Sequence, residues 1–211
     1  GKVVAADSLL VDRRMLAASG LTAAPSVISL LQQAEIEVEE SLVPVPVVTV
    51  SETLTADAET LRERQTALGR KATQIMQQAT GADAAVLIAQ QIAGALEAGD
   101  RSLNELESLF PNTGEIVLIE AYGSDLYEAL EAALYELPSD WFPQISGMQT
   151  VLNRTAEPGS RVFRIRSGRR SVQDDTVYTI AATRELAEAV LPGIPVAGTG
   201  VTLPELLFHM L

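Results

Sequence analysis

The chain has 211 residues, 47% of them hydrophobic, which is enough for a substantial core without disulfide bonds or a structural metal. It contains no cysteine, which excludes a disulfide framework and a thiolate metal site. Its 28 acidic and 15 basic residues give a formal charge of −13, which disfavours nucleic acid as a partner because the phosphate backbone is repelled. No apolar run approaches the roughly 20 residues of a membrane-spanning helix, so we expect no membrane span.

The first 42 residues predict a lead-in segment. Lys2–Leu10 is a short extended piece, and apolar residues at helical spacing predict a helix over Ala24–Glu39. Because the chain opens at Gly1 in a strand-like run without an initiator methionine, we interpret it as a piece of a longer protein. We expect residues 1–42 to be a linker and residues 43–211 to form one folded unit.

Three elements are predicted between residues 42 and 89. Leu42–Val50 is an apolar run broken by two prolines, which favours an edge strand because proline cannot donate to a central ladder. Glu59–Thr80 carries one apolar stripe at helical spacing and predicts a single helix that ends at Gly81. Ala84–Ala89 is a short apolar run that predicts a strand buried on both faces.

The second half of the chain mixes strands and helices. Glu115–Ala121 predicts a strand, followed by a helix with Ser124 as its N-cap that continues to Pro138. Two short helices, Arg184–Val190 and Leu203–Met210, close the chain. Between Pro138 and these two helices, turn residues separate three runs that predict a meander or a set of hairpins: Met148–Asn153, Arg161–Arg166 and Thr176–Ala182. Without a strict βαβ repeat, this order predicts an α+β fold with a mixed β-sheet and packed helices.

Five short strings of the chain resemble a known family. In chain order they are Leu68-Gly69-Arg70, Ala79-Thr80-Gly81-Ala82-Asp83, Phe142-Pro143-Gln144-Ile145-Ser146-Gly147, Pro158-Gly159-Ser160-Arg161-Val162 and Tyr178-Thr179-Ile180-Ala181. Each is similar to a string of the 5′-nucleotidase C-terminal domain, in the same order and at the same spacing. The resemblance covers roughly Val43–Val190, and Gly1–Asp12 is similar to the exit of the metallophosphatase domain that precedes it in the family. We therefore expect a 5′-nucleotidase C-terminal-domain-like fold.

The resemblance implies that catalysis belongs to another part of the protein. In the family, an N-terminal metallophosphatase domain holds two divalent metal ions and hydrolyses a phosphate ester, and the C-terminal domain grips the nucleoside. This chain has one histidine, His209, which we interpret as a packed or surface residue. We therefore expect no cofactor, metal site or catalytic residue in this fragment, with the missing N-terminal domain as its partner. Family members are often periplasmic, secreted or attached to the cell surface.

Most positions that the family uses for binding carry other residues here. The family's Asn-Gly-Gly-Gly-Ile-Arg turn aligns with Ile88–Ala93, which contains none of its asparagine, glycines or arginine. Asn112 stands where the family places one of two aromatic rings that stack on the base, and Glu185 stands where it places the other. Ala189-Val190-Leu191 replaces the family's Gly-Gly-Asp. Phe110, on the other side of a proline, is a substitute ring or a core residue.

The family's Arg-x-Arg is retained as Arg62 and Arg64. In the family the first of these arginines contacts substrate, which makes Arg62 the binding residue that the resemblance carries over; the alternative is that both arginines form ordinary surface ion pairs. Our candidate substrate-binding residues are therefore Arg62, Arg64, Phe110 and Asn112.

Two functions remain open. The chain is the substrate-binding domain of a 5′-nucleotidase-family hydrolase that takes a nucleotide or another phosphorylated small molecule, or it is a structural domain that docks on or dimerises the catalytic domain. An independent enzyme would need a carboxylate pair such as Asp174 and Asp175, but adjacent residues point apart on a strand.

Overall fold

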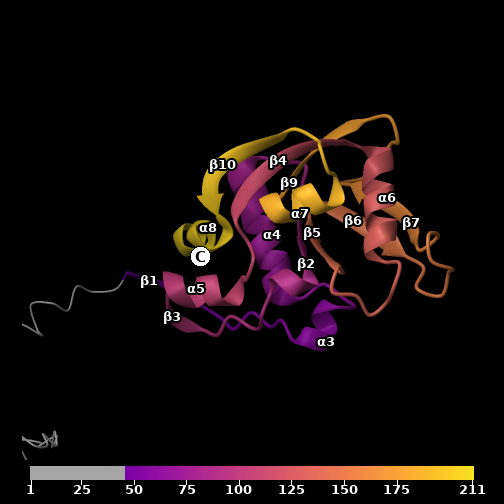
Figure 1. Ribbon diagram of the computed structural model, residues 1–211. Coiled ribbons are helices and arrows are strands. Elements are labelled where there is room, and N and C mark those ends of the chain that lie inside the picture. The colour runs from indigo at the N-terminus through magenta and orange to yellow at the C-terminus, as the bar shows by residue number, and fades with distance from the viewer. Residues whose placement is uncertain (1–45) are drawn as a thin grey trace, which may run out of the picture. The chain divides into compact units, whose positions relative to one another are not determined.

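The computed structural model describes residues 46–211. The extended piece Lys2–Leu10, the helix Ala24–Glu39 and the linker 1–42 lie outside the described residues, so they and the boundary at residue 43 stay predictions. The described part contains three β-sheets and a set of short to medium helices (Figure 1). Between residues 46 and 211, no helix combines the length and the apolar character needed to cross a bilayer.

A five-stranded mixed sheet forms the centre of the fold. Its strand order is β10 (Val196–Thr202), β4 (Glu115–Tyr122), β9 (Val177–Thr183), β2 (Ala84–Ile88) and β5 (Pro143–Ser146). Only β2 and β9 run parallel to each other, and the other neighbours are antiparallel. The α+β class with a mixed sheet is therefore confirmed, as are the predicted strands at residues 84 and 115.

Two smaller sheets flank the central one. Strand β1 (Val47–Val50) pairs only with β3 (Gly99–Ser102), which fits the prediction of an edge strand at the start of the domain. Strands β6 (Met148–Leu152), β7 (Val162–Ser167) and β8 (Arg170–Ser171) form a separate antiparallel sheet. The prediction that the three runs form one meander or hairpin set was wrong for the third run, because β9 pairs with β2 and β4 in the central sheet.

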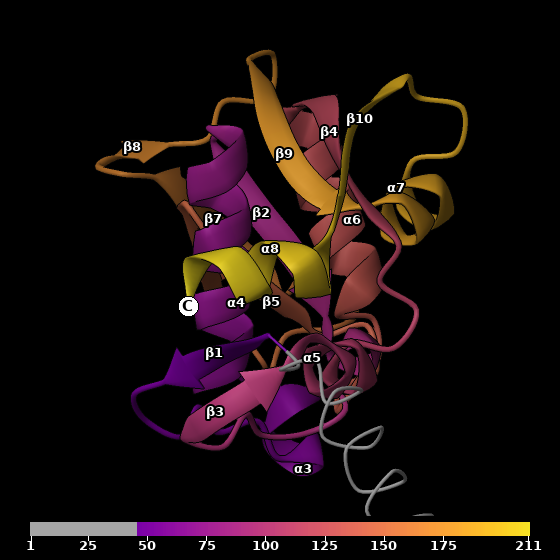
Figure 2. The same cartoon turned by 90° about the vertical axis from the view of Figure 1, so that its left-hand side faces the viewer.

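Helices cover both faces of the central sheet (Figures 1 and 2). One face packs against α4 (Ala67–Thr80), α5 (Leu103–Leu109) and α8 (Leu203–Met210). The other face carries α6 (Gly123–Ala133) and α7 (Arg184–Val190). Helix α3 (Ala58–Leu61) lies in the connection between β1 and α4, and the 3-10 turn η1 (Ala89–Gln91) lies in the connection between β2 and β3. Both closing helices were predicted correctly.

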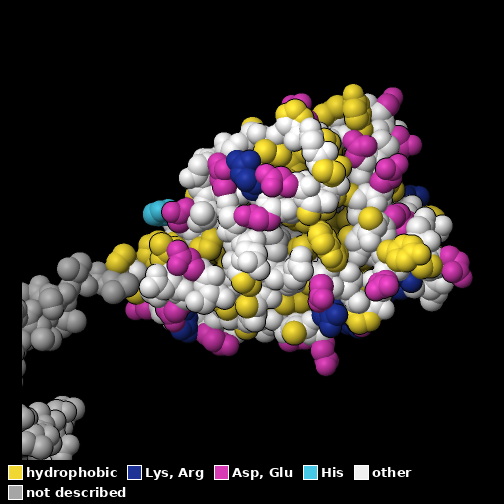
Figure 3. Space-filling model, viewed as in Figure 1, with side chains coloured by type: hydrophobic (Ala, Val, Ile, Leu, Met, Phe, Trp, Pro, Cys, Tyr) yellow, Lys and Arg dark blue, Asp and Glu magenta, His cyan; other side chains and the backbone are white. Residues whose placement is uncertain are grey.

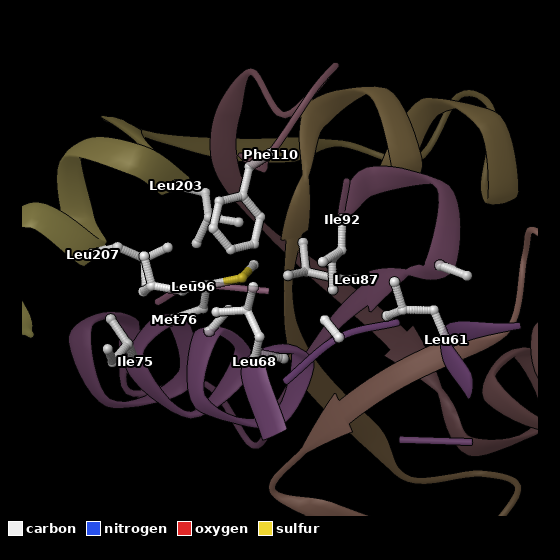
Figure 4. Packing of buried hydrophobic residues seen from close by; sticks show 14 of the residues in the cluster. Leu61, Leu68, Ile75, Met76, Leu87, Ile92, Leu96, Phe110, Leu203 and Leu207 are labelled. Atoms are coloured by element: carbon white, nitrogen blue, oxygen red, sulfur yellow. The ribbon is translucent and has the colours of Figure 1, made fainter. Parts of the chain in front are cut away.

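The main core lies between the central sheet and the helices α4, α5 and α8. Leu87 of β2 meets Leu68 and Met76 of α4 in this core, and α8 contributes Leu203 and Leu207 (Figure 4). All five side chains are fully buried, and alternation along β2 sends Ala84, Val86 and Ile88 to the opposite face. The two faces of the sheet therefore have separate cores.

The predicted single helix over Glu59–Thr80 was wrong, because the chain leaves helical geometry between Leu61 and Ala67. The buried side chain of Gln144 in β5 bonds to the backbone there. Its Oε1 accepts from the N–H of Thr66 at 2.8 Å, and its Nε2 donates to the carbonyls of Leu61 at 3.3 Å and Arg64 at 2.9 Å. These groups would otherwise bond within a helix, so α4 begins anew with Thr66 as its N-cap.

Helix α6 also differs from its prediction at both ends. Its N-cap is Tyr122, whose N–H donates to the Asp125 carboxylate at 3.0 Å, and not Ser124. It ends at Ala133, several residues before Pro138. At that end, the guanidinium of Arg161 donates to the carbonyls of Leu134 at 2.5 Å and Tyr135 at 3.0 Å. A side chain from the neighbouring sheet thus replaces the last helical hydrogen bonds.

Gln144 belongs to the string Phe142–Gly147, and its neighbours in that string are structural too. The hydroxyl of Ser146 donates to the carbonyl of Thr73 in α4 at 2.7 Å. Gly147 has a φ of 78°, and a methyl group there would overlap the carbonyl oxygen of Asp83. A methyl group at Gly69 of α4 would overlap the Gln144 side chain. The string therefore joins α4 to β5.

Replacing Gln144 with Leu should lower the free energy of unfolding by about 2–4 kcal/mol, because buried backbone groups of Leu61, Arg64 and Thr66 would lose their partners. Chemical denaturation measures this change. The matched control is Gln149→Leu, at an exposed position of β6, which should stay within about 0.5 kcal/mol of the parent chain. Equal losses in the two variants would contradict the role given to Gln144.

Candidate functional site

The candidate site is a rim at the carboxyl ends of the two parallel strands, β2 and β9. In open sheets, the ends of parallel strands are the usual place for a ligand. Ile88 ends β2 and Thr183 ends β9. The buried side chain of Gln91 in η1 donates to the Thr183 hydroxyl at 2.7 Å and accepts from the Ile88 N–H at 3.2 Å. This bridge holds the connection after β2 against the start of α7.

The turn before β4 joins the same rim. The N–H of Ala93 donates to the carbonyl of Leu109 at 2.8 Å, which places the end of α5 beside the segment 88–93. The N–H of Gly114 donates to the carboxylate of Glu185, on the first turn of α7, at 3.1 Å. The structure therefore brings together the three segments that the sequence comparison aligned with the family's binding positions: residues 88–93, the turn at Asn112, and the turn at Glu185.

Arg62 approaches this rim from the other side. It follows α3, and its guanidinium pairs with the Asp140 carboxylate at 2.9 Å. The loop 139–142 connects the two regions: Ser139 donates to the carbonyl of Arg62 at 2.9 Å, and Gln90 donates to that of Asp140 at 3.0 Å. The Arg62 and Asp140 side chains are 45% and 59% exposed, so this ion pair is open to solvent.

Arg64, Phe110 and Asn112 are placed differently. Arg64 is an exposed residue of the bend between α3 and α4, and its carbonyl accepts from Gln144. Phe110 is 2% exposed and packs beside Leu203 in the main core (Figure 4). Its ring therefore has the core role that the sequence left open and presents no face to a ligand. Asn112 is exposed, with a φ of 56° that asparagine tolerates better than most residues, so it shapes the turn.

Glu115 and Arg184 form an ion pair at the rim that the sequence did not reveal. Antiparallel pairing of β4 and β9 sets Ile116 opposite Thr183, and this register places the two charged residues side by side. Glu115 also accepts from the Gly200 N–H at 2.7 Å. The Arg184 hydrogen bond, followed by that from Gly200, lowers the pKa of Glu115, and the Glu115 carboxylate raises the pKa of Arg184. Only the strand register could have disclosed this pair.

The rim carries charged and amide side chains but no cluster of metal ligands. In the part of the chain that the structure describes, no group of three or more histidine, cysteine or acidic side chains could hold a metal ion. The two metal ions of the family are expected in the separate metallophosphatase domain, and that expectation stays a prediction. His209 lies at the end of α8 and packs edge-on against the ring of Phe208, away from the rim. The rim offers guanidinium groups, carboxylates and amides.

Comparison with known proteins finds one matching family model and several solved structures with a similar fold. The family model described as 5′-nucleotidase, C-terminal domain, matches residues 46–189. No curated protein sequence matches the chain. A 5′-nucleotidase precursor from Thermus thermophilus is similar, with a TM-score of 0.72, 18% identity, and coverage of 84% of this chain and 38% of its own.

Two further solved structures share the fold. The NAD nucleotidase of Haemophilus influenzae has a TM-score of 0.67 and 14% identity, and the match covers 97% of this chain and 43% of that one. The sulfate thiohydrolase SoxB of Thermus thermophilus has a TM-score of 0.57 and 18% identity, with 91% of this chain and 36% of that chain covered. The chain thus spans about two fifths of the length of these structures.

Replacing Glu115 with Gln should make the chain less stable at neutral pH but not in acid. Because its folded-state pKa lies below the usual 4.5, ionised Glu115 stabilises the fold above that pH, and the stabilisation is lost as the pH falls through the folded-state pKa. Thermal unfolding should therefore show a gap in Tm between the parent chain and E115Q at about pH 7 that closes towards about pH 3.

The control for this experiment is Glu120→Gln, an exposed position of the same strand, which removes the same charge without touching Arg184. A gap between the parent chain and E115Q that persists unchanged in acid would contradict the role of the ion pair.

Proposed function

We propose that this chain, which belongs to the 5′-nucleotidase C-terminal domain family, is the substrate-binding domain of a larger phosphoester hydrolase. Bond cleavage takes place on a separate metallophosphatase domain of the parent protein, which supplies the divalent metals. This domain contributes the guanidinium of Arg62 to a phosphorylated substrate. The carrying observation is the position of Arg62, paired with Asp140 beside the carboxyl end of β2.

The Arg62–Asp140 pair has the properties of a site that can exchange its anion. A guanidinium presents parallel N–H donors that match the oxygens of a phosphate group. Both side chains are about half exposed, and ion pairs of this kind contribute little free energy because water and salt screen them. A phosphate group with two negative charges can therefore displace a single carboxylate at modest cost.

The rim supports recognition of the charged group and not of a nucleobase. Segment 88–93 has no glycine that would let backbone amides approach a ligand, Asn112 and Glu185 supply no ring, and the Phe110 ring is buried. Stacking on aromatic rings contributes about 1–3 kcal/mol per base, and this contribution is missing. The fold is shared with a sulfate thiohydrolase as well as with nucleotidases, so the fold by itself does not require a nucleoside phosphate as substrate.

Calorimetric titration of the chain tests this proposal. Inorganic phosphate, AMP and UDP-glucose should bind with dissociation constants of about a millimolar, and adenosine should give no heat because it has no phosphate. Asp140→Asn should strengthen phosphate binding, since it removes the competing carboxylate, and Arg62→Ala should weaken binding about tenfold or more.

The matched control is Arg154→Ala, because Arg154 also pairs with a partly exposed carboxylate, Glu63 at 3.7 Å, but is not bonded to the rim loop. If no phosphorylated compound gives heat at about 10 mM, the binding proposal fails.

A second candidate function is a structural domain that docks on, or dimerises, the catalytic domain. The observation that favours it is that the guanidiniums of Arg62 and Arg184 already have carboxylate partners, Asp140 and Glu115. Together with the missing rings and glycines, these pairs describe a rim that has lost its ligand while the fold has been kept.

Sedimentation velocity distinguishes this candidate. A dimerising domain should sediment faster as the concentration rises to about 100 μM, and a docking domain should co-sediment with the separately produced metallophosphatase part of its parent protein. A chain that stays monomeric and binds no such domain, yet gives heat with phosphate, would leave the substrate-binding proposal standing alone.

A further inference from the structure

A pocket of about 110 Å³ lies on the sheet face opposite α4, between α6 and α7. Strands β2, β4 and β9 form its floor with Ile88, Ile119 and Ile180, and Leu130 and Leu186 line its walls. Thr150 and Trp141 are the lining residues whose side chains carry an O–H or N–H group, and the lining surface is almost entirely apolar. Figure 3 shows hydrophobic side chains gathered in the hollow between these two helices.

The pocket separates two apolar clusters on one sheet face. Leu126 and Leu130 of α6 pack with Ile145, Ile165 and Ile180 in one cluster. The other cluster joins Leu186 and Ala187 of α7 to Ile88, Ile119 and Ala182. The space between the clusters is bordered by small side chains, among them Ala129 and Ala133 of α6 and Ala187 of α7, which cannot reach across it.

Hydrogen bonds on the side of α6 that faces away from the pocket keep this helix apart from α7. The Glu131 carboxylate accepts from the N–H groups of Arg161 at 3.0 Å and Val162 at 2.6 Å. The hydroxyl of Tyr127 accepts from the N–H of Ile165 at 3.1 Å. These bonds tie α6 to β7, so it cannot move over the sheet to fill the pocket without leaving backbone donors unpaired.

Helix α7 is held on its own outer side by contacts at the rim. The ion pair of Arg184 with Glu115 and the bond from Gly114 to Glu185 fix its first turn. The pocket opens at the other end of α7, beside Val190 and Leu191. The pocket adjoins the rim, because Ile88 and Trp141 of the loop 139–142 line it, but Arg62, Asp140, Glu115 and Arg184 are not among its lining residues.

The mouth of the pocket is acidic. It continues into a shallower hollow that shares Ala129, Trp141 and Leu191 with the pocket and adds the carboxylates of Asp125 and Glu128 from α6. No lysine or arginine is among the described residues that line either part. With a chain charge of −13, this arrangement attracts cations to the entrance of an apolar space.

We propose that the pocket binds a small amphiphilic cation, whose alkyl chain or single ring enters between α6 and α7 while its positive group stays at Asp125 and Glu128. The pocket, at about 110 Å³, is smaller than the apolar cavity of about 150 Å³ that holds a benzene ring, so its size favours a slender alkyl chain. Burial of the ligand's alkyl chain against the apolar lining favours binding, and the carboxylates of Asp125 and Glu128 favour a cationic ligand over a neutral or anionic one. This proposal uses Asp125 and Glu128 and not Arg62 or Asp140, so it can be tested separately from the phosphate-binding proposal.

Titration with three probes of equal chain length tests the proposal: hexylammonium, 1-hexanol and hexanoate. Trp141 is the only tryptophan of the chain and lines the pocket, so its fluorescence reports occupancy, with calorimetry as a second readout. Hexylammonium should bind about fivefold more tightly than 1-hexanol, and hexanoate should bind most weakly. The preference for the cation should shrink when salt is added.

Variants locate the site. Ala129→Phe fills the pocket and should abolish binding of all three probes; Ala79→Phe, at an exposed position of α4, is the matched control and should not. Ala133→Leu serves the same purpose if thermal unfolding shows that Ala129→Phe does not fold. Glu128→Gln should bring the affinity for hexylammonium closer to that for 1-hexanol, whereas Glu107→Gln on α5 should leave the difference between the two affinities unchanged.

Three outcomes would overturn the proposal. The first is no response of Trp141 and no heat with hexylammonium at millimolar concentration. The second is equal binding of hexylammonium and hexanoate, which would remove the selection for a cation. The third is a Trp141 signal that follows protein concentration instead of probe concentration, which would assign the pocket to a second copy of the chain.

Discussion

The fold depends on one buried amide. Gln144 lies on the edge strand β5, is fully inaccessible to solvent, and bonds to the backbone on both sides of the break between α3 and α4. A buried amide is costly unless its donors and acceptor are paired, and here the partners are backbone groups that the interrupted helix releases. The break in the helix and the buried glutamine therefore require each other.

The break between α3 and α4 also positions the candidate site. Because the helix stops at Leu61, the carbonyl of its C-cap residue Arg62 is free to accept from the N–H of Ser139, the first residue of the loop that reaches the end of β2. A continuous helix would use that carbonyl for its own hydrogen bond and would carry the guanidinium along its surface. The packing of β5 against α4 thus decides where the rim arginine lies.

The two faces of the central sheet are packed differently. On the α4 face, large side chains such as Leu68, Met76 and Leu87 interlock without access to solvent, and that core holds the domain together. On the α6 and α7 face, polar bonds hold the helices apart and alanines border the space between them. The two proposed ligand sites lie at the edges of this second face.

The sequence by itself determined the family, the α+β class and the positions of most central strands and closing helices, because apolar periodicity and the short strings are local features. The strings proved to be packing elements, Gln144 and Gly147 above all, which is why they identify the fold even where Ile88–Ala93 and Glu185 differ from the binding pattern. Arg62 was named from the resemblance alone, and its contact with substrate stays a prediction. Tertiary structure decided the rest: the break before Ala67, the separation of β9 from the β6–β8 sheet, the burial of Phe110 and the pairing of Glu115 with Arg184. Each depends on contacts between residues far apart in the chain, whose energies no local pattern contains.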